Sequence, residues 1–367
     1  MKIGYVGMDA TNYGSASHEC KVARVLAELG HEVFLLAERV PNWGEEKLPS
    51  GLTCSVAPVN VASQAEEVGA SLSDDFDVVF ASSASGAPIV ESWMKRTGKN
   101  GVAQVLDVPM WRLLWRERAP WFEQWRPWFS SLMRMSRVVV NTEQTSQDLQ
   151  FAAALYEHRN DDGSGKVPPR TVVYYGIDVE AADASVKADV RPIVGRSCVG
   201  VSRLVPYKGF DFGIAALGLV RAESRPQYRI VGSGEDQARL AQLGQLTGVD
   251  VALVGGVSDA QKFGLIKASD FGLCLAFNPF IPLQFPMEAA YCGKVSIVAD
   301  LPINRERFLD KGVVYVDPFD TRQVAGAIEA LSDALPDASQ HRDWIRENRS
   351  FASHAFGIEK VLRAVAA

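Results

Sequence analysis

The chain has few cysteines, and none of them lies in a motif that would pair them or bind a metal. Its 367 residues include five, Cys20, Cys54, Cys198, Cys274 and Cys292, which are widely spaced and odd in number. Several lie within apolar runs, and no CxxC or Cys/His grouping occurs. We therefore predict buried thiols in a reducing compartment, hence a cytoplasmic location, and no metal site.

The sequence also lacks long hydrophobic runs and an excess of positive charge. No apolar run approaches the length that spans a bilayer, and the start, MKIGYVGMD, lacks the charged lead and apolar core of a signal peptide. We therefore predict a protein without a transmembrane segment. The 38 Lys and Arg residues against 44 Asp and Glu, a net charge of −6, argue against bulk nucleic-acid binding.

Short apolar runs alternate with helix-like segments, and the pattern occurs twice. In the first half the runs are Ile3 to Met8, Val33 to Ala37, Cys54 to Val59, Val78 to Ala81, Val102 to Leu106 and Val138 to Asn141. In the second they are Val199 to Ser202, Tyr228 to Val231, Val251 to Val254, Gly272 to Leu275, Val295 to Ala299 and Val313 to Val316. This rhythm is typical of parallel α/β sheets, and the length suits two domains. We predict an α/β fold with two Rossmann-like domains.

Residues 199–217, VGVSRLVPYKGFDFGIAAL, combine a strand, a loop and a helix with two cations. The run VGVS is typical of a buried parallel strand, and Phe210, Ile214 and Leu217 recur at helical spacing. Arg203 and Lys208 therefore fall at a strand-to-helix turn, on the sheet edge where ligands bind. A planar guanidinium and a mobile ammonium suit a diphosphate, although two basic residues can also merely flank a surface turn.

The same segment resembles the donor-diphosphate loop of family 4 retaining glycosyltransferases, whose pattern is an apolar strand, Gly-Arg-Leu, a few residues and Lys-Gly. Ser202 stands here where Gly is common. The resemblance follows the order of elements along nearly the whole chain. It implies the glycosyltransferase-B (GT-B) fold: an acceptor domain at 1–185 and a nucleotide-sugar donor domain at 186–341 facing across a cleft, with a helix at 342–367 returning to the first domain.

The resemblance also implies a donor of the UDP or GDP type and several donor contacts. Gly14 and Ser15 precede a helix and resemble the family's Gly-Gly loop, although a simple tight turn is the alternative. Gly232 and Gly234 follow the strand YRIV, and a loop there could pass beneath a nucleotide. Gly256 and Val257 match a segment that packs on the base.

The family's paired glutamates are only half present. Glu288 matches the second, which can accept both hydroxyls of a ribose, whereas Phe280 stands at the position of the first. Nucleotide binding is thus better supported than sugar identity, and a nucleotide-sugar-binding pseudoenzyme is the alternative to a transferase. An epimerase or phosphorylase of the same fold is disfavoured, since further cleft carboxylates or a cofactor-binding Lys are not found in order.

The resemblance implies a transfer that retains configuration and needs neither a metal nor a cofactor. Arg203 and Lys208 would neutralise the departing diphosphate, an electrostatic contribution that is usually large. Asp107, in VLDVP at the end of a first-domain strand, is the carboxylate best placed to contact the acceptor or the sugar. A strand-end Asp that caps the next helix is the alternative.

Residues Trp111 to Trp128, WRLLWRERAPWFEQWRPW, hold five of the eight tryptophans with arginines interleaved. Core or interface packing explains such a segment, because large aromatics usually bury. The other interpretation is a platform for a polyanionic acceptor, either a lipid phosphate at a membrane surface or a nucleic acid. The donor is therefore predicted as a nucleotide sugar, and the acceptor stays open.

Overall fold

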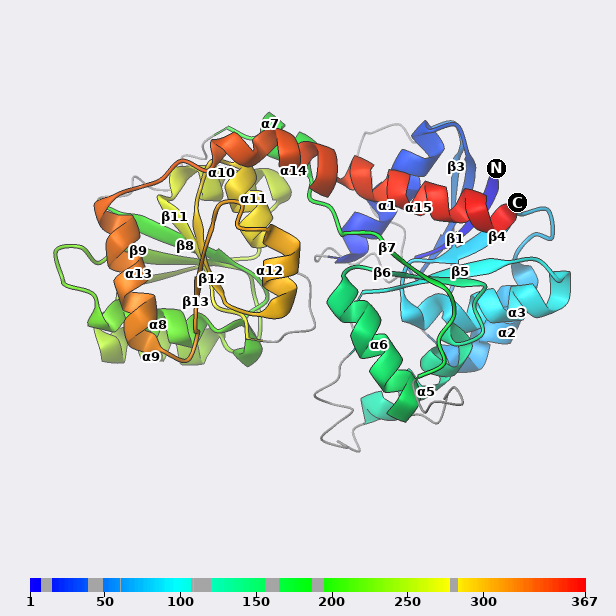
Figure 1. Cartoon of the computed structure of the whole chain (residues 1–367), viewed down its shortest axis with the longest axis horizontal. Coiled ribbons are helices and arrows are strands. Elements are labelled where there is room, and N and C mark those ends of the chain that lie inside the picture. The colour runs from blue at the N-terminus through cyan, green and yellow to red at the C-terminus, as the bar shows by residue number, and fades with distance from the viewer. Residues whose placement is uncertain are drawn as a thin grey trace. The chain divides into compact units, whose positions relative to one another are not determined.

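The computed structural model describes residues 1–7, 15–38, 49–59, 61–106, 108, 120–155, 165–186, 195–277 and 283–367, with the backbone alone at 15–20 and 120–124. The chain forms two compact units (Figure 1). Unit 1 comprises Met1–Tyr175 and Phe351–Ala367, and unit 2 comprises Gly176–Ser350. Each unit has its own hydrophobic core.

Unit 1 is built on a parallel sheet with the strand order β3-β2-β1-β4-β5-β6-β7. Its strands are β1 (Lys2–Val6), β2 (Glu32–Ala37), β3 (Leu52–Val56), β4 (Val78–Ala81), β5 (Gly101–Val105), β6 (Arg137–Val140) and β7 (Arg170–Val172). β1 lies between β2 and β4, with Ile3 aligned with Val33 and Val78. The central strands are buried on both faces, which explains their continuous apolar sequences.

Helices cover both faces of this sheet. They are α1 (Ser15–Glu28), α2 (Ala65–Ser71), α3 (Ala87–Thr97), α5 (Pro120–Leu132), α6 (Glu143–Leu155) and α15 (Phe351–Ala366). Figure 1 shows α1 and α15 together above the sheet and α2, α3 and α5 below it, in agreement with the contacts within each group. The last helix therefore belongs to the first unit, as the sequence analysis expects.

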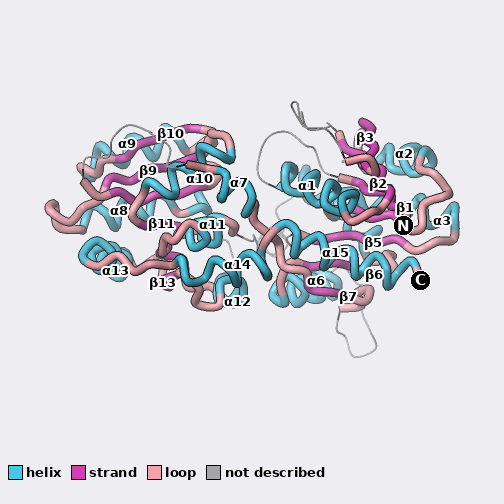
Figure 2. Tube along the Cα trace, turned by 90° about the horizontal axis from the view of Figure 1, so that it is seen from above, coloured by secondary structure: helices cyan, strands magenta, loops and turns pink. Residues whose placement is uncertain are grey.

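Unit 2 has a second parallel sheet, with the order β10-β9-β8-β11-β12-β13. Its strands are β8 (Ser197–Val201), β9 (Gln227–Val231), β10 (Val251–Gly255), β11 (Phe271–Cys274), β12 (Ser296–Ala299) and β13 (Val313–Val316). In Figure 2 the strands of each unit run alongside one another with helices outside them. The predicted fold of two Rossmann-like domains is confirmed.

Most helices of unit 2 fall into two layers. The helices of this unit are α7 (Val179–Ala184), α8 (Phe210–Leu219), α9 (Gln237–Thr247), α10 (Asp259–Ala268), α11 (Phe285–Tyr291), α12 (Pro302–Phe308), α13 (Thr321–Asp333) and α14 (Arg342–Arg349). α7, α10, α11 and α14 pack together on one face, and α8, α9 and α13 pack on the other. Short 3₁₀ turns occur at Ala62–Gln64, Ala84–Gly86, Pro206–Lys208 and Ser339–His341.

The chain changes unit after Tyr175 and again after Ser350. The boundaries predicted from the sequence fall after residues 185 and 341. The difference comes from two short helices, because Val179 and Ala182 of α7 and Ile345 of α14 are buried in the core of unit 2. A backbone hydrogen bond from the Ile177 amide to the Arg349 carbonyl, at 2.7 Å, further joins these segments within that unit.

The last helix is attached to unit 1 by a buried polar contact as well as by apolar packing. His31 is 3% exposed, and its Nε2 lies 2.8 Å from Oε1 of Glu359 on α15. The same oxygen accepts hydrogen bonds from Nε and Nη2 of Arg363. Burial alone would raise the pKa of Glu359, but these partners together hold it below its usual value.

We expect Glu359→Gln to lower the melting temperature by about 3–6 °C at pH 7, since hydrogen bonds to a charged group contribute about 1.5–3 kcal/mol. The folded-state pKa is depressed, so this contribution is complete above the unfolded value of about 4.3 and is lost as the pH falls through the lower folded value. Melting curves from pH 7 to pH 3 check this. An exposed control, Glu347→Gln, should shift melting by less than about 1 °C, and an equal loss at pH 3 and pH 7 would contradict the linkage.

The described cysteines are all free thiols, as predicted. Cys198, Cys274 and Cys292 are buried and Cys54 is half-buried. Burial raises the pKa of Cys274 to about 11 and that of Cys292 to about 12, so both are protonated at neutral pH. No helix within the described ranges is long and apolar enough to cross a bilayer.

Candidate functional site

The strand order of unit 2 predicts where a ligand binds. From β8 the chain continues to β9 and β10 on one side, and it then returns to β11, β12 and β13 on the other. The order therefore reverses between β8 and β11, and ligands of open parallel sheets bind at the carboxyl ends of the strands at such a point. The loops that follow β8 and β11 are the candidate site.

The β8–α8 loop carries both predicted cations and joins them through a tyrosine. Nη2 of Arg203, an exposed residue, donates a hydrogen bond of 2.9 Å to the hydroxyl of Tyr207. Lys208 is 8% exposed, and its Nζ lies 5.4 Å from the centroid of the Tyr207 ring. Both cations therefore contact one side chain. Tyr207 is a member of this site that the sequence analysis did not single out.

The loop ends at Gly209, where only glycine fits. Its φ of 69° is in the left-handed region, and a Cβ there would lie 2.2 Å from the Leu275 carbonyl oxygen. The Phe277 amide also donates to the Tyr207 carbonyl, at 3.2 Å. The two loops at the reversal point, after β8 and β11, are thus in direct backbone contact.

The loop after β9 contains Gly232 and Gly234 and is called the glycine loop. It packs against the β8–α8 loop that carries Arg203 and Lys208, which is called the cation loop. The Leu204 amide donates to the Ser233 carbonyl at 2.9 Å, and the Asp236 amide donates to the Leu204 carbonyl at 3.0 Å. A Cβ at Gly232 or Gly234 would lie 1.9 Å or 2.2 Å from a carbonyl oxygen of the cation loop. Close packing against the cation loop therefore explains why both positions are glycine. Their role beneath a nucleotide stays a prediction.

Gly256 and Val257 lie next to this pair of loops. The Gly232 amide donates to the Gly255 carbonyl at 2.8 Å, which ties the end of β10 to the glycine loop. Gly256 is exposed, and Val257 is half-buried against the core of unit 2. Ser258 then begins α10 with a capping box to Gln261. The backbone near Gly256 is accessible to a ligand such as a base.

Glu288 lies in the first turn of α11 and is 4% exposed. Its Oε1 accepts a hydrogen bond of 2.7 Å from Nζ of Lys262 on α10, and Nζ also lies 3.0 Å from Oδ1 of Asp259. Burial would lower the pKa of Lys262, but the two carboxylates outweigh burial and raise it. Lys262 is not predicted from the sequence, because its partner lies on another helix and no sequence spacing indicates the pair.

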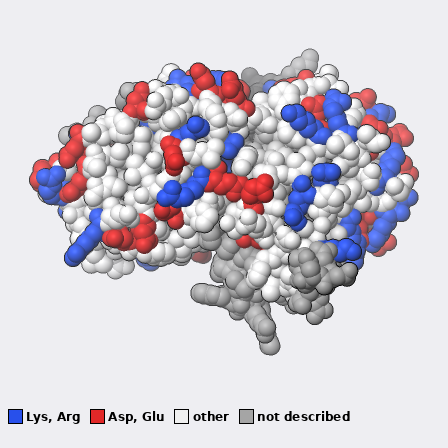
Figure 3. Space-filling model, viewed as in Figure 1, with Lys and Arg blue, Asp and Glu red and all other residues white. Residues whose placement is uncertain are grey.

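Several predicted residues lie outside the described residues. They are Gly14, Asp107, Phe280 and most of the stretch from Trp111 to Trp128. Ser15 begins α1, and its backbone alone is described. Within the aromatic stretch, Trp125 is 3% exposed and stacks on Phe129 at 5.0 Å between centroids. Packing therefore explains Trp125. Figure 3 shows both signs of charge mixed over the described surface that it presents.

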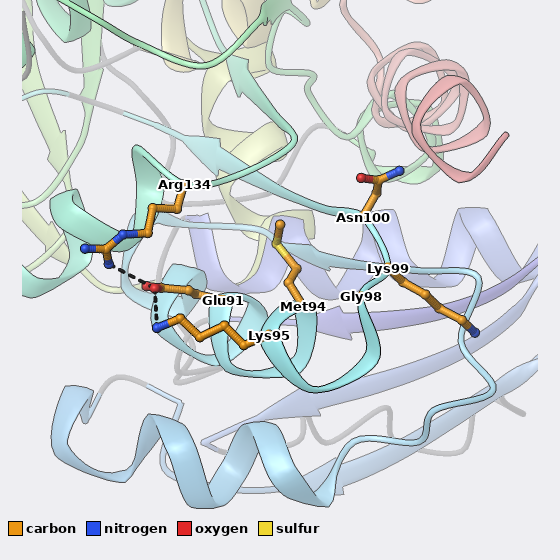
Figure 4. A pocket seen from close by; sticks show the side chains of 7 residues that line it. All are labelled: Glu91, Met94, Lys95, Gly98, Lys99, Asn100 and Arg134. Carbon is orange, nitrogen blue, oxygen red and sulfur yellow. Dashed lines mark hydrogen bonds and ion pairs between the residues drawn. The ribbon is translucent and has the colours of Figure 1, made fainter.

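A hollow of about 300 Å³ in unit 1 is a poor candidate for the site. Figure 4 shows Glu91 there between Lys95 and Arg134, at 2.7 Å and 2.9 Å. Burial would raise the pKa of Glu91, but these cations and Ser131 lower it. The hollow lies where α3 runs into the amino end of β5, the edge opposite to the one where ligands bind. Glu91 is thus a charge-compensated structural group.

Two parallel α/β units, the second with its cations at the reversal point, are the components of a GT-B fold. The comparisons with known proteins agree. Residues 196–351 match the family model for glycosyl transferases group 1. This match covers less than half of the chain and agrees with the sequence resemblance to GT-B glycosyltransferases similar to family 4. A search of the curated proteins gives no match.

Solved structures share the fold over the whole chain. HepE from Anabaena, in complex with UDP and glucose, is 16% identical with a TM-score of 0.75, covering 99% of this chain and 100% of that one. Sucrose-phosphate synthase from Thermosynechococcus elongatus is 14% identical with a TM-score of 0.75, covering 99% and 98%. A trehalose-6-phosphate protein from E. coli, bound with UDP-2-fluoro glucose, is 12% identical with a TM-score of 0.74, covering 99% of each chain.

Proposed function

We propose that this protein transfers a sugar from a nucleoside diphosphate sugar to an acceptor with retention of configuration. The observation that carries the proposal is the pair Arg203 and Lys208, which share Tyr207 at the reversal point of the second sheet. The guanidinium and the ammonium would bind the diphosphate and neutralise the charge that develops as it departs. These cations allow the transfer to proceed without a metal or a cofactor.

The remaining residues are assigned around that diphosphate. Glu288 would accept hydrogen bonds from the ribose, and the glycine loop at Gly232 and Gly234 and the backbone at Gly256 and Val257 would lie against the nucleotide. Gly14, Ser15 and Asp107 are assigned from sequence position alone, Asp107 to the acceptor or sugar and the other two to the donor phosphates. The free thiols among the described cysteines support a cytoplasmic location.

The donor prediction is tested by melting curves with UDP, GDP and a panel of their sugars. A ligand at a hundred times its Kd contributes about 2.7 kcal/mol, so the correct nucleotide should raise the melting temperature by about 5–10 °C. UDP is tested first, because it occurs in two of the structures compared above. Inorganic pyrophosphate serves as the control for charge alone. No shift with any nucleotide would contradict donor binding.

Transfer is then tested with the donor that binds. Release of the nucleoside diphosphate, with a product whose anomeric configuration matches the donor by NMR, is the expected result. Phe280, at the position of the first family glutamate, favours one alternative, a binding protein without turnover. That alternative predicts tight nucleotide binding with neither transfer nor hydrolysis of any donor in the panel.

A further inference from the structure

Glu288 and Lys262 form a pair in which one carboxylate oxygen is occupied. Glu288 is almost fully buried, and its Oε1 accepts the Lys262 hydrogen bond at 2.7 Å. Among the described residues, no donor reaches Oε2. Oε2 is also not among the fully enclosed polar atoms without a partner. The carboxylate thus keeps an oxygen that can accept hydrogen bonds from a ligand.

The ammonium group of Lys262 is also surrounded by several contacts. Its side chain is 17% exposed, and Nζ contacts Asp259 one turn earlier on α10 and lies 4.5 Å from the centroid of the Phe263 ring. The ammonium therefore has two carboxylates and one aromatic face around it. With two negative groups and one positive group, the cluster retains a net negative charge, which suits it to accept hydrogen bonds from neutral hydroxyl groups.

Fold stability alone is a weak reason for this arrangement. A buried ion pair is costly to desolvate, and apolar residues of similar volume often stabilise a protein as well or better. The α10 neighbours Phe263, Leu265 and Ile266 are buried apolar residues, so an apolar side chain at position 262 would suit this surface. Lys262 instead fixes the direction of a carboxylate in the first turn of α11.

We propose that Lys262 is a positioning residue that makes the nucleotide site select ribose over deoxyribose. By holding Oε1 of Glu288, it keeps the carboxylate in one orientation, so that the 2′- and 3′-hydroxyls of the donor ribose donate to it without the entropic cost of ordering a free side chain. This inference rests on the proposed function, and it names the sugar of the nucleotide rather than the sugar transferred.

The test compares nucleoside diphosphates that differ only in these hydroxyls. Kd is measured by calorimetry for UDP and GDP and for their 2′-deoxy and 2′,3′-dideoxy forms. In Lys262→Met, the affinity for the ribonucleotide should fall about tenfold to a hundredfold, because hydrogen bonds to a charged group are lost or weakened. The affinity for the dideoxy form should change less than about twofold. The preference for ribose therefore falls.

Lys267→Met is the matched control on the same helix. Nζ of Lys267 donates to the Ala182 and Ser185 carbonyls, so its loss disturbs α7 and α10 without touching Glu288. The ratio of ribo to dideoxy affinity should stay as in the wild type. Should Lys262→Met not fold, Lys262→Leu, which also removes the N–H donor, carries the same expectation.

A double-mutant cycle separates positioning from a structural role. In a Glu288→Gln background, Lys262→Met should leave the ribose preference unchanged, because Lys262 acts through that carboxylate. Lys262→Arg should restore part of the preference. An equal loss of ribo and dideoxy affinity in Lys262→Met would make the pair structural and overturn the inference. A wild-type protein that binds nucleotides without a ribose preference also overturns it, while no nucleotide binding at all overturns the proposed function as well.

Discussion

Lys208→Ala is expected to lower kcat about a hundredfold to a thousandfold with a smaller change in KM. Removing one preorganised donor from a developing charge costs about 2.7–4 kcal/mol of transition-state stabilisation. Lys208 is buried with its Nζ 5.4 Å from the centroid of the Tyr207 ring, and this loop contains no other lysine that could replace its ammonium. The effect on kcat and KM is measured from initial rates with the nucleotide sugar that stabilises the protein in the melting experiment.

The control for this experiment separates lost charge from lost packing. Lys208→Met keeps the apolar stem and removes the ammonium, so it should fold like the wild type and lose about as much kcat as Lys208→Ala. Lys360→Ala, at an exposed position on α15, should leave the rate unchanged. Turnover near the wild-type level in Lys208→Met would remove this residue from the leaving-group role.

Substitution of Arg203, alone and together with Lys208, provides a second test of the same site. Because Arg203 and Lys208 both contact Tyr207, their substitutions should be less than additive in their effect on kcat. Additive losses would indicate two independent sites of action.

The sheets could be predicted from the sequence because parallel strands buried on both faces leave continuous apolar runs. Every run identified in the sequence corresponds to a strand. The strand β7 was missed, because Arg170–Val172 is short and half-buried and merges with the residues that follow it. The positions at which the chain changes unit, 175 and 350, could not be predicted from the sequence either, because they depend on where α7 and α14 pack.

The residues of the candidate site also differ in whether they could be predicted from the sequence. Arg203 and Lys208 could be found because their position in a strand–loop–helix unit fixes where they lie. Tyr207 and Lys262 could not, because their importance comes from partners that only the fold brings near. Gly232 and Gly234 can be recognised by residue type, but no sequence pattern indicates that their neighbour is the cation loop.

Gly232→Ala is the second large effect, and we expect it to destabilise unit 2 by about 4 kcal/mol. The φ of 136° is a conformation that L residues rarely adopt, which costs about 1–3 kcal/mol. A Cβ would also lie 1.9 Å from the Ser202 carbonyl oxygen, a backbone atom that cannot rotate away, and such overpacking adds about 1–3 kcal/mol. The melting temperature should fall by about 8–16 °C.

Gly248→Ala is the matched control for the loop contact. Gly248 follows α9 with a φ of 65°, and no atom lies within 4 Å of a Cβ placed there. Its substitution should cost only the left-handed strain, about 1–2 kcal/mol. The difference between the two variants, measured by denaturant unfolding, isolates the collision with the cation loop.

Gly232→Ala should also weaken nucleotide binding. Ser202 directly precedes Arg203, so a backbone shift that relieves the collision at Ser202 should also displace Arg203. Folded Gly232→Ala should therefore bind the nucleotide more weakly than Gly248→Ala. Equal stability of the two variants would show that the loops after β8 and β9 are not packed as described, and it would remove the support that holds Arg203 in place.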